Sequence, residues 1–266
     1  MAFSIKGKTA IVTGAADGIG LAIARHMADR GANVMAADMN EKKLIEELGN
    51  EPEDGNIRVF AGDLRQRLTI ANLISATIDA FDQVDILVNA SRQVMVTDAL
   101  NVEDTSVSTL LDQNLMTALS LSQLVAKRMM KQAEKQPDGQ VGAIINLSSI
   151  AARQSRPDLM GYAIAAAAVQ QMTRSMAMVL AEHRIRVNAI AFGSVMSASL
   201  RTAVAENREW RDDIRENTPL GRIAAPTELC ETVQFLAAES SSFMTGEVLT
   251  IDGGRSLLDV VSSPAH

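Results

Sequence analysis

The chain has 266 residues, of which 47% are hydrophobic and 21% are charged, and its formal net charge is −7 at pH 7. This composition is typical of a globular α/β protein, and the negative charge argues against a nucleic-acid or anionic-membrane partner. No apolar run is long enough to cross a membrane and no leader segment is visible, so we expect a cytoplasmic protein. The lone cysteine, Cys230, cannot form a disulfide within the chain, and the spacing of the three histidines predicts no metal site.

Short apolar runs alternate with segments of helical periodicity along the whole chain. The predicted strands are 8–13, 33–37, 57–60, 85–89, 141–148, 186–191 and 248–251, and the clearest predicted helices are 69–80, 105–131, 162–182 and 227–238. Such alternation builds a parallel sheet with helices on both faces. We therefore predict a single domain over residues 1–266 with a doubly wound, seven-stranded fold. The segment 194–220 is predicted to be a flexible insert, and a candidate lid, at the carboxyl ends of the strands.

The first predicted strand leads into a turn with three glycines at 13–20, which is followed by a helix start. The free N–H groups and the partial positive charge of a helix start can hold a pyrophosphate. Asp38, eighteen residues beyond Gly20, ends the second strand, where a carboxylate can accept hydrogen bonds from an adenosine ribose. Asp17 and Asp38 would repel a ribose 2′-phosphate, so the sequence favours NAD over NADP. An ordinary tight turn, with Asp17 as a helix N-cap, is the simpler alternative.

Further strings extend this pattern through the rest of the chain. They are Asp63-Leu64 after the third strand, Asn89-Ala90-Ser91-Arg92 after the fourth, Asp112-Gln113-Asn114-Leu115 within a helix, Ser149 thirteen residues before Tyr162, Arg186-Val187-Asn188-Ala189-Ile190, Pro219-Leu220-Gly221-Arg222, Thr245-Gly246 and Asp252-Gly253-Gly254. Together with the glycine pattern G-x-x-x-G-x-G at Gly14, Gly18 and Gly20, they resemble the short-chain dehydrogenase/reductase family in its single-domain form.

The resemblance implies an oxidoreductase that interconverts an alcohol and a carbonyl on a small or medium, largely apolar substrate, and that assembles as a homotetramer or homodimer. Ser149 would bind the substrate oxygen and Tyr162 would exchange the proton, with Asn114 completing the catalytic set. The implied NAD contacts are Gly14, Asp17, Gly18, Ile19, Gly20, Asp38, Asp63, Leu64, Asn89, Tyr162, Val195 and Ser197. The apolar piece 257–261 is a candidate subunit interface. Candidate substrate contacts, for which core packing is an equal explanation, are Met95, Val96, Met160, Met196 and Leu200.

Three motifs depart from the family pattern. Its Tyr-x-x-x-Lys motif would place lysine at 166, where this chain has Ala166, and its Asn-Asn-Ala-Gly string keeps only Asn89. Its Pro-Gly after the sixth strand is Phe192-Gly193 here. Residues four apart on a helix share a face, so a lysine at 166 would sit beside the phenol of Tyr162. A free tyrosine, with a pKa of about 10, is a neutral acid at pH 7, and a neighbouring cation makes it a usable base.

Three interpretations of Ala166 stay open. The alanine is a substitution, natural or made in the laboratory, that silences the enzyme. Alternatively, Arg92, Arg153 or Arg156 supplies the missing cation. In the third interpretation the protein has given up turnover and is a non-catalytic NAD-binding scaffold or partner subunit.

Overall fold

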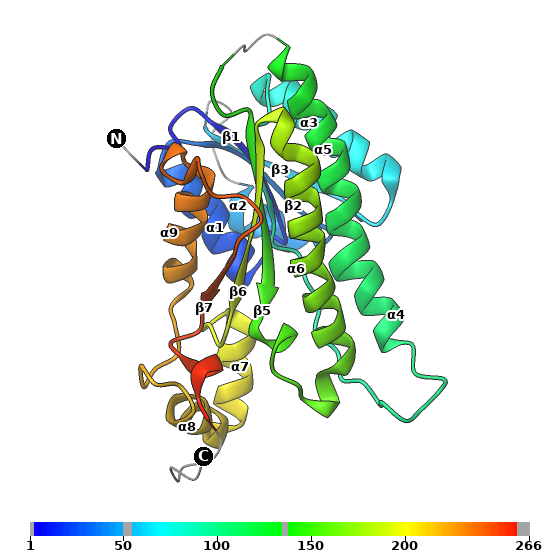
Figure 1. The fold of residues 1–266 in the computed structure, drawn as a ribbon, viewed down its shortest axis with the longest axis vertical. Helices are drawn as coiled ribbons and strands as arrows, with labels where there is room; N and C mark the ends of the chain where they lie inside the picture. Colours follow the sequence, from blue (N-terminus) through cyan, green and yellow to red (C-terminus); the bar gives the residue numbers. More distant parts are fainter. Residues whose placement is uncertain (1–2, 50–54, 135–137, 260–266) are drawn as a thin grey trace.

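Seven parallel strands form one sheet in the computed structural model, which describes residues 3–49, 55–134 and 138–259 (Figure 1). In chain order they are β1 (Thr9–Thr13), β2 (Asn33–Asp38), β3 (Ile57–Ala61), β4 (Ile86–Asn89), β5 (Gly142–Ser149), β6 (Ile185–Phe192) and β7 (Val248–Ile251). Their spatial order is β3-β2-β1-β4-β5-β6-β7, so the winding direction reverses between β1 and β4. Ligands bind at such a switch point in doubly wound sheets. The predicted fold class is confirmed, and each strand lies within one residue of its predicted bounds.

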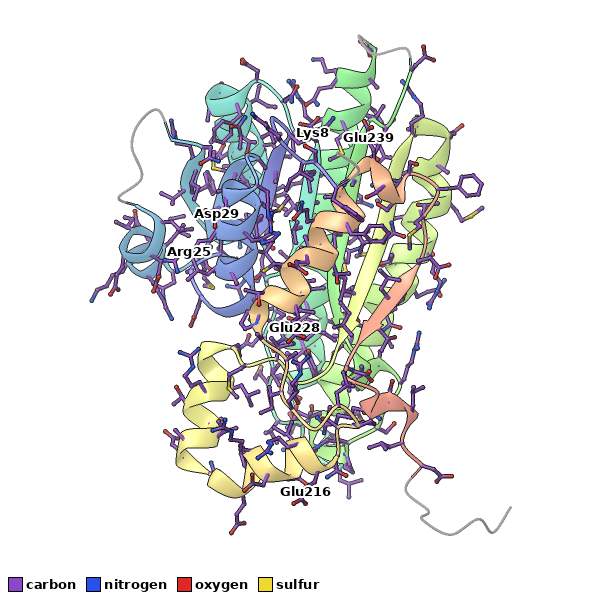
Figure 2. All side chains as sticks on the ribbon, turned by 90° about the vertical axis from the view of Figure 1, so that its left-hand side faces the viewer. Lys8, Arg25, Asp29, Glu216, Glu228 and Glu239 are labelled. Carbon is purple, nitrogen blue, oxygen red and sulfur yellow. The ribbon has the colours of Figure 1, made fainter. Side chains whose placement is uncertain are left out.

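Helices cover both faces of the sheet. They are α1 (Gly18–Asp29), α2 (Glu41–Leu48), α3 (Arg67–Phe81), α4 (Ser106–Leu110), α5 (Thr117–Ala133), α6 (Met160–Leu180), α7 (Ala198–Glu206), α8 (Arg208–Glu216) and α9 (Pro226–Ala237). One apolar core lies beneath α1, α2 and α9, and a second lies beneath α3, α5 and α6. Figure 2 faces the first of these layers, with Arg25 and Asp29 on α1 and Glu228 at the start of α9.

The five inner strands are buried on both faces, which explains their continuous apolar sequences, whereas the edge strands β3 and β7 are partly exposed. Ala10 and Val12 of β1 belong to the core under α1 and α9, whereas Ile11 between them belongs to the opposite core. All eight residues of β5 and all eight of β6 are buried. A slip of one residue in register would exchange the two sets of side chains, so each side chain must fit the core that it faces.

The segment 194–220 contains two helices, α7 and α8, in place of the predicted flexible insert. Ser197 caps α7 by accepting a hydrogen bond from the Leu200 N–H at 3.3 Å. The parallel bridge between Val195 and Ala224 ties the base of the segment together. Both helices lie beyond the carboxyl ends of β5–β7, where the segment was expected (Figure 1). No helix in the described ranges is long and apolar enough to span a bilayer.

Candidate active site

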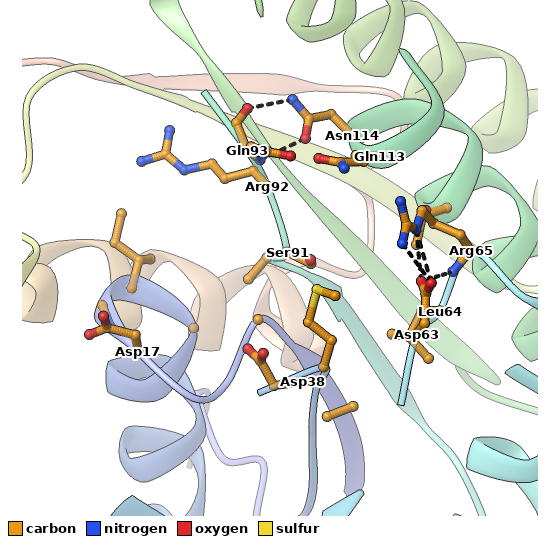
Figure 3. A pocket seen from close by; sticks show the side chains of 18 of the residues that line it. Asp17, Asp38, Asp63, Leu64, Arg65, Ser91, Arg92, Gln93, Gln113 and Asn114 are labelled. Atoms are coloured by element: carbon orange, nitrogen blue, oxygen red, sulfur yellow. Dashed lines mark hydrogen bonds and ion pairs between the residues drawn. The ribbon is translucent and has the colours of Figure 1, made fainter. Parts of the chain in front are cut away.

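A cavity of about 540 Å³ opens at the carboxyl ends of the strands around the switch point (Figure 3). It brings together ten of the predicted site residues, namely Gly14, Asp17, Gly18, Ile19, Gly20, Asp38, Asp63, Leu64, Asn114 and Ser197. Three predicted cofactor residues lie elsewhere. Asn89 and Tyr162 line neighbouring cavities, and Val195 is buried in the apolar core under α1, α2 and α9. The remaining predicted catalytic residue, Ser149, also lines a neighbouring cavity.

The glycines of the first turn are required by the chain's own packing. Gly14 has φ +66°, and a Cβ there would lie 2.9 Å from the Cα of Ser91 in the loop after β4. A Cβ at Gly20 would lie 2.1 Å from the carbonyl oxygen of Gly14. The turn must therefore be glycine-rich to pack against the β4 loop and to enter α1, before any ligand binds.

Two of the three acidic residues in this cavity are paired with cations that the sequence analysis did not identify. Asp17 caps α1 by accepting from the Gly18 N–H at 2.6 Å and forms an ion pair with Lys43 of α2. Burial raises the pKa of the Asp17 carboxyl, but the hydrogen bonds from Lys43 and Gly18 outweigh it and leave the pKa below its ordinary value. Lys43 therefore offsets much of the negative charge that was expected of Asp17.

The other two acids differ in their partners. Arg65 makes a bidentate contact with Asp63 at 2.7 and 2.9 Å, and these hydrogen bonds lower the pKa of the Asp63 carboxyl (Figure 3). Asp38 accepts hydrogen bonds from the backbone N–H groups of Ala16 at 3.1 Å and Asn40 at 2.9 Å. Its carboxylate thus joins the glycine turn to the end of β2, facing the cavity.

Asn114 lies on a π-helical turn, Leu111–Met116, between α4 and α5. The prediction of one regular helix over 105–131 is therefore wrong at its centre, because an extra residue widens this turn. Such turns recur at functional sites. The buried amide of Asn114 accepts from the Gln93 N–H at 2.7 Å and donates to the Gln93 carbonyl at 2.8 Å (Figure 3). Both hydrogen bonds hold the loop that follows β4.

A second cavity, of about 930 Å³, lies on the other side of this loop and is lined by Ser149 and Tyr162. Both side chains are buried, at 8% and 7% exposure. Arg92 donates from Nη1 to the Tyr162 hydroxyl at 2.6 Å, and its guanidinium carbon lies 4.5 Å from the centre of the Phe192 ring. Of the three arginines considered from the sequence, Arg92 reaches the phenol, whereas Arg153 is exposed and Arg156 pairs with Asp158 at 2.8 Å.

Ala166 lines a third, much smaller cavity beside the phenol, of about 20 Å³. The amides of Asn89 and Asn146 share its wall and are joined by a 2.7 Å hydrogen bond. Ser148 donates to the Ala166 carbonyl at 3.0 Å. Asn89 therefore links β4 to β5 next to this small cavity, away from the dinucleotide-sized one.

The substrate contacts expected from the sequence are absent from the wall of the 930 Å³ cavity. Met95 packs against the cluster that contains Leu110 and Tyr162, and Val96 is 72% exposed. The apolar part of the wall comes mainly from other residues, which are Val94, Ile150, Ala151, Leu159, Trp210, Ile214 and Leu258. Trp210 and Ile214 are four residues apart on α8, and this helical spacing of two apolar residues could have indicated a cavity wall. The prediction of a flexible insert over 194–220 did not use it.

Comparison with known proteins identifies the family. The sequence profile described as enoyl-(acyl carrier protein) reductase matches residues 14–256. The 3-oxoacyl-(acyl-carrier-protein) reductase FabG of Thermotoga maritima is 30% identical over 254 residues, which cover 94% of this chain and 98% of that protein. The chain belongs to the short-chain dehydrogenase/reductase family. Another member, dehydrogenase/reductase SDR family member 4 of Caenorhabditis elegans, is 33% identical over 94% of this chain and 95% of its own length.

Solved structures of short-chain dehydrogenases/reductases share the whole fold. A short-chain type dehydrogenase/reductase from Mycobacterium marinum superimposes with a TM-score of 0.82 at 28% identity, covering 96% of this chain and 97% of its own. A 7α-hydroxysteroid dehydrogenase complexed with NADH and 7-oxo glycochenodeoxycholic acid gives 0.84 at 29% identity, with 95% and 96% covered. The protein is thus an oxidoreductase of this family.

Proposed function

We propose that the protein is an NAD(H)-dependent oxidoreductase that interconverts an alcohol and a carbonyl by hydride transfer. The observation that carries this proposal is the position of the Tyr162 phenol. It lies in the wall of the 930 Å³ cavity together with Ser149, and Arg92 joins it to the wall of the 540 Å³ cavity. A substrate oxygen in the larger cavity can reach a proton donor and a hydroxyl at once.

The residues that line the 540 Å³ cavity are of the kinds that bind a dinucleotide. The first turn of α1, at Gly18–Gly20, supplies the helix start for a pyrophosphate, and Asp38 supplies a carboxylate for ribose hydroxyls. Lys43 compensates Asp17 and Arg65 compensates Asp63, so the preference for NAD over NADP rests mainly on repulsion between Asp38 and a 2′-phosphate. The NADH in the related 7α-hydroxysteroid dehydrogenase supports a nicotinamide cofactor.

In the reductive direction the residues of this chain would bind and protonate the substrate carbonyl. The reduced nicotinamide, when bound, supplies the hydride that the carbonyl carbon receives. Ser149 donates a hydrogen bond to the carbonyl oxygen, and Tyr162 gives that oxygen its proton. Asn114, through Gln93, holds the loop between the two cavities in place. Such a proton transfer contributes about 10²–10⁴ in rate.

Ala166 favours a second candidate, a scaffold or partner subunit that binds NAD without turnover. Its methyl group leaves a cavity of about 20 Å³ beside the phenol. Among the described residues, the cation that contacts the phenol is Arg92 of the β4 loop, and none does so from α6. The two candidates share the dinucleotide site and differ in whether Tyr162 exchanges a proton with a substrate.

We also propose a cytoplasmic homotetramer or homodimer. Within the apolar piece 257–261, Leu257 is 85% exposed, whereas Leu258 lines the 930 Å³ cavity. Val260 and Val261 lie outside the described residues. Light scattering tests the assembly, and a monomeric mass would contradict it.

The function is tested by NADH oxidation against a broad panel of ketones, aldehydes and β-ketoacyl compounds, with Tyr162→Phe as the matched control. We expect turnover that falls by about 10²-fold or more in Tyr162→Phe, because the variant retains the ring but has no proton to give. Binding of NADH without turnover on any compound would favour the scaffold. Equal turnover by the two proteins would contradict the proposed role of Tyr162.

A further inference from the structure

Arg92 lies where the three cavities of the site meet. Of the described residues, it is the one that lines all three cavities. Its side chain extends from the loop after β4 to the Tyr162 hydroxyl of α6, at 2.6 Å, and covers the ring of Phe192 at the end of β6, at 4.5 Å. Three elements that are distant in sequence therefore converge on one guanidinium group.

The backbone on both sides of Arg92 is fixed by buried side chains. Thr13, at the end of β1, accepts hydrogen bonds at its Oγ1 from the N–H groups of Ala90 and Ser91, both at 3.0 Å. Asn114 accepts from the N–H of Gln93 at 2.7 Å. The loop is therefore hydrogen-bonded to the end of β1 on one side of Arg92 and to the π-helical turn on the other. These bonds fix the backbone of the loop that carries Arg92, and the contacts with Tyr162 and Phe192 hold its guanidinium.

The direction of the hydrogen bond determines what the phenol can do. A guanidinium only donates and is never deprotonated in proteins, so the Tyr162 oxygen is the acceptor of this bond. The phenol's own O–H is then free to be donated elsewhere, and it lies in the wall of the 930 Å³ cavity beside Ser149. The arrangement presents the proton to a ligand in that cavity.

Transfer of that proton changes the strength of the contact with Arg92. The O–H bond of Tyr162 breaks, a new O–H bond forms at the substrate oxygen, and the electron pair stays on the phenol oxygen as a negative charge. A guanidinium cation attracts a full negative charge on the phenol oxygen more strongly than it attracts the oxygen of a neutral hydroxyl. The contact at 2.6 Å therefore stabilises the state after proton transfer more than the state before it, which is the property that accelerates a reaction.

We propose that Arg92 is a catalytic residue of this oxidoreductase, which aims the Tyr162 phenol and stabilises the negative charge that develops on its oxygen. The inference rests on the proposed function. Ala166, one turn beyond Tyr162 on the same helix face, leaves room for about one water molecule, so the cation reaches the phenol from the β4 loop and not from α6. The ring of Phe192 stabilises the guanidinium of Arg92 by a cation–π contact.

Other charged groups face the same cavity from the surrounding elements. Arg156 and Asp158, before α6, pair with each other, and Arg255, after β7, donates to the Ser194 hydroxyl at 2.9 Å. Asp213 lies on α8 in the same wall. These groups set the background field, and the guanidinium of Arg92 is the group bonded directly to the phenol oxygen.

The test compares Arg92→Ala, Arg92→Gln and Arg92→Lys with the parent protein and with Arg153→Ala, an exposed arginine outside the cavity walls. Arg92→Gln keeps a hydrogen-bond donor without the charge, and Arg92→Lys keeps the charge. We expect kcat to fall by about 10²-fold in the alanine and glutamine variants, to be largely restored in the lysine variant, and to be unchanged in Arg153→Ala. NADH affinity and the melting temperature, measured on each variant, separate this loss from lost binding or folding. Parental kcat in Arg92→Gln would overturn the proposal.

A second measurement does not depend on turnover. Tyr162 is the only tyrosine in the chain, so the phenol band of the ultraviolet difference spectrum reports on this side chain alone. At one fixed pH, we expect this band to shift in Arg92→Gln relative to the parent protein, because the phenol oxygen loses its charged hydrogen-bond donor, and to stay in place in Arg153→Ala. Superimposable bands in Arg92→Gln and the parent protein would overturn the inference. A shifted band together with a parent protein that turns over no substrate would instead contradict the proposed function.

Discussion

Introducing a lysine at position 166 is a stringent test of how the site is interpreted. Ala166→Lys adds three methylene groups and an ammonium to a cavity of about 20 Å³, which holds about one water molecule. The new side chain must displace its neighbours, and overpacking of this kind costs about 1–3 kcal/mol. Its charge would also face the guanidinium of Arg92, which lines the same cavity. We therefore expect Ala166→Lys to lower both the stability and the turnover of the protein.

The magnitude can be worked out from these two costs. Overpacking near the middle of its range lowers the free energy of unfolding by about 2 kcal/mol, which corresponds to roughly 4–8 °C in melting temperature for a chain of this size. Ala167→Lys, at the adjacent exposed position of α6, is the control and should change stability by less than about 0.5 kcal/mol. The two charges should also couple by about 0.5–3 kcal/mol, since they share one cavity.

The assay is a double-mutant cycle of Ala166→Lys and Arg92→Ala, read by thermal melting and by NADH-dependent turnover. We expect the double variant to recover part of the stability lost in Ala166→Lys and to turn over faster than Arg92→Ala, because the ammonium then has space beside the phenol. An Ala166→Lys protein as stable as its parent and more active would refute this reasoning. In that case the small cavity accommodates lysine, and Arg92 does not replace it.

Three further predictions concern other parts of the fold. Gly14→Ala and Gly221→Ala share the same backbone strain, since both glycines have φ +66°, but only the first places a Cβ against the β4 loop. NADH affinity should therefore fall at least about tenfold in Gly14→Ala and remain at its parental value in Gly221→Ala, as measured by fluorescence titration. Hydrogen bonds from Arg222 lower the pKa of Glu228 to about 2, so this carboxylate stabilises the fold above its ordinary pKa of 4.5 and loses that effect as the pH falls towards 2. Glu228→Gln should accordingly be less stable than the parent at pH 7 by at most about 1 kcal/mol in urea unfolding, and most of this difference should be lost at pH 2. Burial raises the pKa of the Cys230 thiol to about 12, so Cys230 should react with a disulfide reagent only after unfolding, and rapid labelling of native protein would contradict this.

The strands were predictable because their physical cause is visible along the chain. A parallel sheet covered on both faces needs continuous apolar segments, and β5 and β6 are buried along their whole length. The residues of the first turn, Asp38 and Asp63 were predictable because they follow directly after strands, whose carboxyl ends meet at one edge of the sheet.

What was missed depends on contacts between distant segments. Lys43 meets Asp17 across 26 positions only because α2 folds back onto the start of α1. The π-helical turn that carries Asn114 adds a residue without disturbing the apolar spacing over 105–131, so periodicity alone predicts a regular helix. Arg92 was one of three candidate cations, and the fold distinguishes it because its loop, held by Thr13 and Asn114, lets its guanidinium reach the Tyr162 hydroxyl.

The central claim is that the 540 Å³ cavity at the glycine turn holds NAD(H), the dinucleotide without a ribose 2′-phosphate. Isothermal titration calorimetry of the folded protein with NADH and with NADPH tests this most directly. We predict a saturable heat at one site per chain for NADH and a weaker affinity for NADPH, because Asp38 repels the additional phosphate. Tighter binding of NADPH would contradict the role assigned to Asp38, and the absence of heat from both would contradict the account of the site.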